Sequence, residues 1–205
     1  MSDETDNYDW LFSDDNIPQL ETGMQVESRS IIRHAQRRML RTIHQEAVQD
    51  VIILPQIGES LHLISNGIFD FYTLATILIE AMGGKCEHLY ASTWTINQQT
   101  ILDLFDDYDN GRIAHIHILS DVSFKRRKTA NYASLIDGLR ERGQRFIANH
   151  NHSKVVLLNS GDNYISIEGS ASFTTNPRLE QHCISNDYEL WNFHRDWMTE
   201  LLDNA

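Results

Sequence analysis

The sequence predicts an α/β sandwich in which helices flank a mixed sheet, and three observations support that fold class. Short apolar runs alternate with amphipathic runs of helical period along most of the chain. Glycines and polar clusters separate these runs. Near residue 154 the alternation gives way to two β-rich runs joined by a turn. Repeated βα units favour parallel strands, and a late hairpin adds antiparallel ones, so the sheet is expected to be mixed.

The elements follow in order from residue 59. Helices are expected over 67–82, 96–108, 125–142 and 188–202, the first ended by Gly83-Gly84 and the third by Gly143. Strands are expected over 61–65, 87–93, 113–119 and 145–149. The hairpin is expected to pair 154–158 with 164–168 through the turn-forming residues 159–163.

The N-terminal part of the chain differs from the rest. Residues 1–24 hold seven acidic and no basic residues, and we expect an acidic disordered tail there. The aromatic residues of 8–12 suit a segment that orders on a protein partner. Residues 25–55 are predicted to form a basic amphipathic helix and a linker. The folded α/β domain is expected over 56–205.

Composition excludes several classes of protein. With 41% hydrophobic residues the chain is neither collagen-like nor wholly disordered. The net charge of −12 argues against a polyanionic substrate at first sight, but more than half of it lies in residues 1–24. Cys86 and Cys183 form no CxxC pair and indicate reduced thiols. The acidic N-terminus does not resemble a signal peptide, so we expect a cytoplasmic location.

The most informative residues are His152 and Lys154, followed after the hairpin by Gly169 and Ser170. Side chains two residues apart in an extended segment project from the same face, so the imidazole and the ammonium group stand together. Such a pair suits a phosphate group. Gly169 allows a close backbone approach and Ser170 offers a hydroxyl. If the hairpin is in register, both of its ends meet at one edge of the sheet, where sites of α/β proteins usually lie.

The run that begins at His152 resembles the signature of the phospholipase D superfamily, whose half-site reads HxKxxxxD followed by a GSxN-type segment. The phrases IEGSAS at 167–172 and NPRLEQ at 176–181 resemble most closely the phage and mobile-element group of that superfamily. The resemblance implies a phospholipase D-like sandwich with one catalytic half per chain, formed by residues 56–205.

The resemblance also implies a role for each motif residue. His152 is the implied nucleophile on phosphorus, acting through a phosphohistidine. Lys154 would offset the charge that grows in the transition state, and Glu180 would orient and polarise the histidine. Ser170 and Ser172 are the implied substrate-binding residues. The mechanism requires no metal or other cofactor.

Two positions depart from the family pattern. Asn159 stands where the family has Asp, Ser172 stands where it has Asn, and the hairpin is about three residues longer than usual. Two functions therefore stay open. The first is a metal-independent phosphodiesterase, specifically a nuclease. The second is a catalytically degenerate module that binds nucleic acid or protein.

The mechanism needs one histidine to attack and another to protonate the leaving oxygen, yet the chain has a single HxK motif. A homodimer with the two motifs facing across a twofold axis would supply both. Between Lys125 and Lys154 there are eight basic and two acidic residues. This stretch predicts a track for a nucleic-acid backbone, with contacts from Lys125, Arg126, Arg127 and Lys128.

A metal site is the remaining alternative. An HxH pair on a strand suits zinc or a binuclear centre. The candidate ligands are His115, His117, His150, His152, His182 and Cys183. No carboxylate follows at a matching spacing, so packing along the strand explains His115 and His117 equally well.

Overall fold

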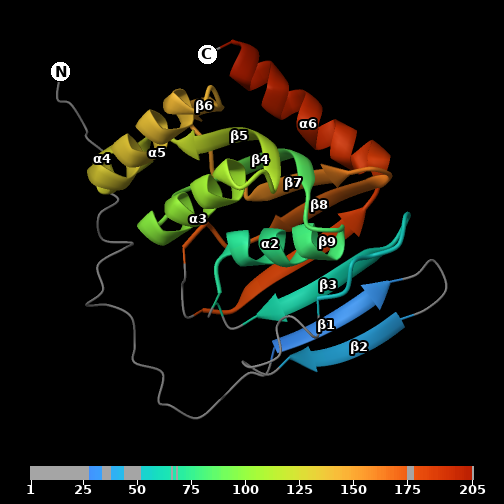
Figure 1. Ribbon diagram of the computed structural model, residues 1–205. Helices are drawn as coiled ribbons and strands as arrows, with labels where there is room; N and C mark the ends of the chain where they lie inside the picture. The colour runs from blue at the N-terminus through green and yellow to red at the C-terminus, as the bar shows by residue number, and fades with distance from the viewer. Residues whose placement is uncertain are drawn as a thin grey trace, which may run out of the picture.

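The computed structural model describes residues 28–33, 38–43, 52–65, 67, 69–174 and 178–204. Nine strands in these residues form one mixed sheet in the order β2-β1-β3-β9-β8-β7-β4-β5-β6 (Figure 1). Strands β4, β5 and β6 run parallel, and the other neighbours are antiparallel. The strands are β1 (Ser28–Arg33), β2 (Arg38–Ile43), β3 (Ser60–Ser65), β4 (Cys86–Thr93), β5 (Ile113–Asp121), β6 (Arg145–Asn149), β7 (Val155–Ser160), β8 (Asn163–Gly169) and β9 (Glu180–Asn186).

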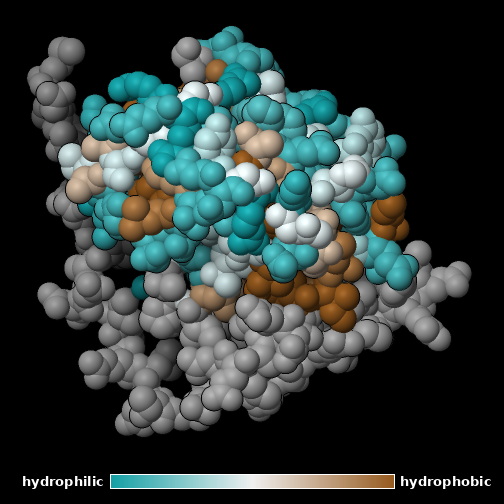
Figure 2. Space-filling view, viewed as in Figure 1, coloured by the Kyte–Doolittle hydropathy of each residue, from teal (hydrophilic) through white to brown (hydrophobic). Residues whose placement is uncertain are grey.

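Helices cover both faces of the sheet, so the predicted fold class is confirmed. One face packs against α2 (Phe71–Ala81), α3 (Gln98–Asp109) and α5 (Thr129–Glu141), and the other against α6 (Tyr188–Asp203). The short helix α4 (Ser123–Arg127) follows β5. Figure 2 shows that hydrophilic residues cover most of the surface on the side of α2 and α3. In the described part of the chain, no helix has both the length and the apolar character that crossing a bilayer requires.

Polar N-caps set where the helices begin. The side chains of Asp70, Asn97 and Asp187 each accept a hydrogen bond from the backbone N–H three residues later. Capping by Asp70 starts α2 at Phe71 and not at residue 67, because the backbone of Asp70 is extended, with a ψ of 171°. The predicted helix 188–202 is confirmed by α6 almost residue for residue.

The predicted hairpin is confirmed, with a tighter turn than expected. Strands β7 and β8 join through the two residues Gly161 and Asp162, and Gly161 has a φ of +54°. Val155 pairs with Glu168, so the two ends of the hairpin meet in register. Residues 155–159 are buried because β7 is covered on both faces of the sheet, which explains their nearly continuous apolar character.

The helix predicted within residues 25–55 is wrong, because the structure has strands β1 and β2 there. The apolar residues of this segment, including the β-branched pair Ile31 and Ile32, fit either period over so short a length. Strand β1 pairs with β3, so hydrogen bonding to the outer side of β3 favours a strand over a helix for this segment. The disorder predicted for 1–24 and the partner-binding role of 8–12 lie outside the described residues.

Two further differences concern the second half of the chain. The single helix predicted over 125–142 is divided at Lys128, whose φ of −139° and ψ of 57° are not helical, into α4 and α5. Strand β9 was not predicted, because its residues alternate weakly and include His182 and Cys183. Strand β9 forms because it lies between β3 and β8, which both pair with its backbone, although its own sequence does not indicate a strand.

His182 on β9 makes the stability of this fold sensitive to acid. Its ring stacks near Phe71 and Phe69, with centroids 5.4 and 6.2 Å away, and burial lowers the pKa of His182 to about 4. An unfolded chain, with an ordinary histidine pKa, binds the proton more readily. The contribution of His182 to the free energy of unfolding is therefore fully present above about pH 6.5. It is lost as the pH drops towards 4, which lowers the free energy of unfolding by about 3 kcal/mol.

We predict that denaturant unfolding measured from pH 7 to pH 5 gives a steadily smaller free energy of unfolding. The variant His182→Gln should show a shallower dependence on pH over this interval, whatever its stability at pH 7, because the titrating ring is gone. An identical dependence on pH in the two proteins would contradict this assignment.

Candidate phosphodiester site at one edge of the sheet

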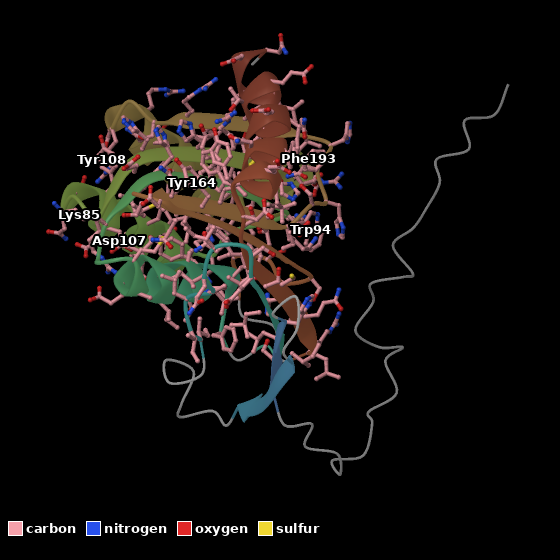
Figure 3. The ribbon with its side chains drawn as sticks, turned by 90° about the vertical axis from the view of Figure 1, so that its right-hand side faces the viewer. Lys85, Trp94, Asp107, Tyr108, Tyr164 and Phe193 are labelled. Atoms are coloured by element: carbon pink, nitrogen blue, oxygen red, sulfur yellow. The ribbon has the colours of Figure 1, made fainter. Side chains whose placement is uncertain are left out.

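The parallel strands β4, β5 and β6 end at one edge of the sheet, which we call the motif edge. Strand β8 also ends there and β9 begins there, because Gly169 pairs with His182. In Figure 3, Lys85 and Trp94, which precede and follow β4, lie on opposite sides of the molecule, and Trp94 marks the motif edge. The edge carries Trp94, Asp121, the HxK segment (150–154), Gly169, Ser170 and Glu180.

His152 and Lys154 stand side by side where the HxK segment leads into β7. Lys154 Nζ donates a hydrogen bond to the His152 carbonyl oxygen at 2.8 Å and lies 3.4 Å from His152 Nδ1. His152 is exposed and Lys154 is partly buried. Burial lowers the pKa of Lys154, and the negative charge of Glu180 opposes that shift. The imidazole and ammonium groups are adjacent, as the alternation of side chains predicts.

Ser170 and Glu180 join the site from β8 and β9. The Ser170 hydroxyl donates a hydrogen bond to Glu180 Oε2 and accepts one from the Gln181 backbone N–H at 3.1 Å. Gly169 permits this approach, since a Cβ atom there would lie 2.6 Å from the Gln181 carbonyl oxygen. Among the described residues, the Glu180 carboxylate bonds to Ser170 and not to His152. The structure therefore places Glu180 at the site without the orienting contact to His152 that the resemblance implies.

Polar side chains that the sequence analysis did not single out hold the HxK segment in place. Ser153 Oγ lies 2.6 Å from Ser92 Oγ, and Asn151 Nδ2 donates to the same Ser92 hydroxyl at 2.8 Å. The Asn151 backbone N–H donates to Asp121 Oδ2 at 3.2 Å. Ser92 on β4 and Asp121 on β5 thus hold Asn151 and Ser153, the residues on either side of His152. The signal was visible in the sequence, because each is a polar residue at the end of an apolar strand.

Trp94 and Arg127 extend the site from His152 towards α4. The Trp94 indole lies edge-on to the His152 ring with centroids 5.8 Å apart, and the Arg127 guanidinium lies 3.6 Å above the Trp94 ring. Arg127 Nε donates to Ser123 Oγ at 3.0 Å. The sequence predicted Arg127 as one of several contacts to a nucleic-acid backbone and gave no role to Trp94. A tryptophan directly after a predicted strand was the signal that could have identified it.

The basic residues between Lys125 and Lys154 divide into two groups. Three are in ion pairs, namely Arg140 with Asp137, Arg142 with Asp109 and Arg145 with Asp203. Within the residues that the structure describes, no ion pair involves the other five, which are Lys125, Arg126, Arg127, Lys128 and Lys154. A paired cation has less charge to offer a phosphate. We therefore restrict the predicted track to the cations at α4 together with Lys154.

Asn159, at the position of the family Asp, is buried at the edge of the sheet opposite the motif edge. Its Nδ2 donates a hydrogen bond to Glu87 Oε2 at 2.9 Å, and its Oδ1 accepts one from the His88 backbone N–H at 3.1 Å. An aspartate here would lack the donor and repel Glu87. The amide is therefore the side chain that these two partners require, and this departure from the family pattern has a structural explanation.

The longer hairpin also leaves the site intact. Its turn, with Asp162 exposed, lies at the edge far from His152, so the added residues lengthen β7 and β8 away from the motif. At the other end the Gly169 N–H donates to the Lys154 carbonyl oxygen at 3.2 Å. Ser172, at the position of the family Asn, is partly exposed, and its carbonyl oxygen accepts a hydrogen bond from Phe71 N at 3.3 Å.

The histidines of the alternative metal site do not gather. His115 and His117 stack with His88, with ring centroids 4.7 and 5.5 Å from it. Burial, with smaller contributions from neighbouring cationic groups, lowers the pKa of His117 to about 3 and keeps that ring neutral. In the described residues no group of three or more His, Cys, Asp or Glu side chains is placed to hold a metal ion. Packing along the strands accounts for His115 and His117.

Three surface hollows of the molecule are not lined by His152, Lys154 or Ser170. The largest, about 770 Å³, is lined mainly from α2 and α3. The other two lie beside α2 and between α5 and β6. The motif residues instead include the exposed side chains of His152 and Ser170, so we place the candidate site on open surface.

No family model matches the chain, and no curated protein matches it either. Among solved structures, a phospholipase D family member, Nuc from Salmonella typhimurium, is 18% identical with a TM-score of 0.46, over 62% of this chain and 85% of that one. NucT from Helicobacter pylori is 14% identical with a TM-score of 0.47, over 68% and 96% of the two chains. TrmBL2, an archaeal chromatin protein with a novel mode of DNA binding, is 14% identical with a TM-score of 0.42, over 70% and 53%.

The sequence from His152 to Glu180 resembles the signature of the phospholipase D superfamily, and Nuc, one of these structurally similar proteins, is a member of that family. Membership of the superfamily, and of its phage and mobile-element group, stays a prediction for this chain.

Proposed function

We propose that the protein is a metal-independent phosphodiesterase of the phospholipase D type, specifically a nuclease, that acts as a homodimer through a phosphohistidine on His152. The observation that carries the proposal is the gathering of His152, Lys154, Ser170 and Glu180 at one exposed edge of the sheet. These side chains come from three different strands or strand ends, and together they offer a nucleophile, a cation and a hydroxyl to one phosphate.

The proposed reaction proceeds in two displacements at phosphorus. Lys154 lies beside Nδ1 of His152, which leaves Nε2 to attack. A P–N bond forms while the bond from phosphorus to the leaving oxygen breaks, and that oxygen takes a proton from a general acid. Water then attacks phosphorus and gives a proton to the conjugate base of that acid, the P–N bond breaks, and the imidazole is regenerated.

Lys154 and Ser170 have complementary parts in this proposal. The Lys154 ammonium group is held by the His152 carbonyl oxygen at 2.8 Å and can offset charge on the non-bridging oxygens. The Ser170 hydroxyl is exposed and can donate to the same phosphate once it leaves Glu180. The Glu180 carboxylate is a positioning group for Ser170, and its charge favours the protonated form of Lys154.

The general acid comes from a second copy of the chain in this proposal. The imidazole that attacks cannot at the same time protonate the leaving oxygen, and the sequence holds one HxK motif. Two copies related by a twofold axis would bring a second His152 to the other side of the phosphate. His152 is exposed at the motif edge, where a second molecule can reach it.

The proposed substrate is a nucleic acid. Lys125, Arg126, Arg127 and Lys128 are exposed, and Arg127 is joined to His152 through Trp94. Such a group of cations next to a phosphate-binding site matches a polymer whose charge recurs at every nucleotide. A cytoplasmic location is part of the proposal, and the free thiols of Cys86 and Cys183 fit it.

The second candidate function is a catalytically degenerate module that binds nucleic acid or a protein. One observation favours it, namely that Glu180 bonds to Ser170 and leaves His152 without an orienting carboxylate in the described residues. Cleavage by the unaltered protein decides between the two functions, since a degenerate module would bind nucleic acid without cutting it.

We predict that the purified protein cleaves single-stranded or double-stranded DNA or RNA in the presence of a chelator, because no step uses a metal. His152→Ala should lower the rate roughly a thousandfold or more, since it removes the nucleophile. His150→Ala is the matched control, because His150 is an exposed histidine two residues away that takes no part in the proposed reaction. Loss of cleavage in chelator, or equal effects of the two substitutions, would contradict the mechanism.

We predict that the active species contains two copies of His152. When wild-type and His152→Ala chains are unfolded together and refolded at a fixed total concentration, activity should follow the square of the wild-type fraction, because only wild-type pairs hold a complete site. Light scattering on the same samples should give the mass of a dimer. Activity that is linear in the wild-type fraction would show that each chain works alone.

A further inference from the structure

Arg127 is held in a fixed position beside the proposed nucleophile. Its guanidinium lies 3.6 Å above the Trp94 ring, and that ring contacts the His152 ring edge-on at 5.8 Å. Stacking on an aromatic face suits the planar guanidinium of arginine and not the ammonium group of lysine. Arg127 and His152 are therefore both neighbours of the same indole ring.

A chain of hydrogen bonds also ties Arg127 to the HxK segment. Arg127 Nε donates to Ser123 Oγ at 3.0 Å, and the Ser123 hydroxyl donates to Asp121 Oδ1. The other oxygen of Asp121 accepts from the Asn151 backbone N–H at 3.2 Å. Arg127 and His152 are thus positioned by one network that spans the end of β5, the start of α4 and the HxK segment.

The network leaves donors of Arg127 available. A guanidinium has five N–H groups. Within the described residues, Arg127 uses Nε for Ser123 and one Nη2 proton for the Trp94 carbonyl oxygen at 3.4 Å. Asp121 attracts Arg127 electrostatically, but no carboxylate of the described residues lies within ion-pair distance of it. Two protons on Nη1 and one on Nη2 remain for a ligand. Because the side chain is already ordered, binding an anion costs little further conformational entropy.

The neighbouring cations differ from Arg127 in this respect. Lys125, Arg126 and Lys128 are exposed, and within the part of the chain that the structure describes their side chains make no hydrogen bond or ion pair. They add a diffuse positive potential around α4 that attracts polyanions. The guanidinium of Arg127 has a fixed orientation as well as a charge, so its N–H groups can bind one particular phosphate.

We infer that Arg127, stacked on Trp94, binds the phosphate next to the scissile phosphate in a nucleic-acid strand. The inference rests on the proposed function, because it takes His152 as the group that attacks the scissile phosphate. A lone phosphodiester has no neighbouring phosphate and gains nothing from Arg127. The Arg127–Trp94 pair therefore makes the site selective for polynucleotides over small phosphodiesters.

The test compares two substrates in the presence of a chelator. One is a single-stranded oligonucleotide, and the other is bis(4-nitrophenyl) phosphate, which has one phosphodiester and no neighbouring phosphate. Arg127→Ala should lower kcat/KM for the oligonucleotide at least about tenfold more than for the small diester, mainly through KM, because a charge-assisted contact is lost. Arg127→Lys, which keeps the charge without the planar stack, should recover part of the loss.

Arg140→Ala is the matched control, because Arg140 is paired with Asp137 on α5 and takes no part in the site. It should leave the ratio of the two kcat/KM values unchanged, and thermal unfolding should show that every variant is folded. Equal losses on the two substrates in Arg127→Ala would overturn the inference, because they would place its effect at the scissile phosphate.

A binding measurement separates failure of this inference from failure of the proposed function. If the wild-type protein cleaves neither substrate, the proposed function fails, and the oligonucleotide serves as a binding probe at several salt concentrations. Loss of one phosphate contact in Arg127→Ala should then flatten the plot of log K against log salt by about 0.7 for a single strand. An unchanged slope would overturn the inference about Arg127 independently of catalysis.

Discussion

Where β8 returns to the start of β7, the Gly169 N–H donates a hydrogen bond to the Lys154 carbonyl oxygen at 3.2 Å, and the arrangement of the motif edge depends on this contact. Gly169 is packed so tightly that a Cβ atom would lie 2.6 Å from the Gln181 carbonyl oxygen. The same closeness lets Ser170 reach Glu180. The pairing register of β7, β8 and β9 therefore brings Lys154, Ser170 and Glu180 together, although they are far apart in the sequence.

The parallel strands on the other side of the hairpin complete the arrangement. Their ends supply Ser92 and Asp121, which form hydrogen bonds with the HxK segment. Asp121 also accepts a hydrogen bond from Ser123, which in turn accepts one from Arg127. The basic residues follow the same division: three that lie away from the motif are in ion pairs, whereas those at α4 form none with any residue that the structure describes. A net charge of −12 is for this reason no obstacle to a polyanionic substrate, since local charge near the site decides the encounter.

Much of this architecture follows from local sequence patterns, and the exceptions have physical causes. The hairpin, the βα alternation and α6 were predictable because periodicity and turn residues agree with tertiary packing there. The segment of β1 and β2 was predicted wrongly because its apolar pattern fits a helix or a strand, and pairing of β1 with β3 favours the strand. The adjacency of His152 and Lys154 could be predicted from spacing alone. The Trp94–Arg127 stack could not, because it joins the segment after β4 to helix α4, and the distance between them depends on how the sheet is assembled.

In the proposed reaction His152 forms a covalent bond to phosphorus during turnover, and the configuration at phosphorus distinguishes this route from direct attack by water. A phosphorothioate diester of known configuration is hydrolysed in water enriched in oxygen-18, and the configuration of the product is determined. Each in-line displacement inverts phosphorus, so two displacements through a phosphohistidine give net retention. Net retention is the predicted result, and net inversion would contradict it, because inversion requires direct attack by water.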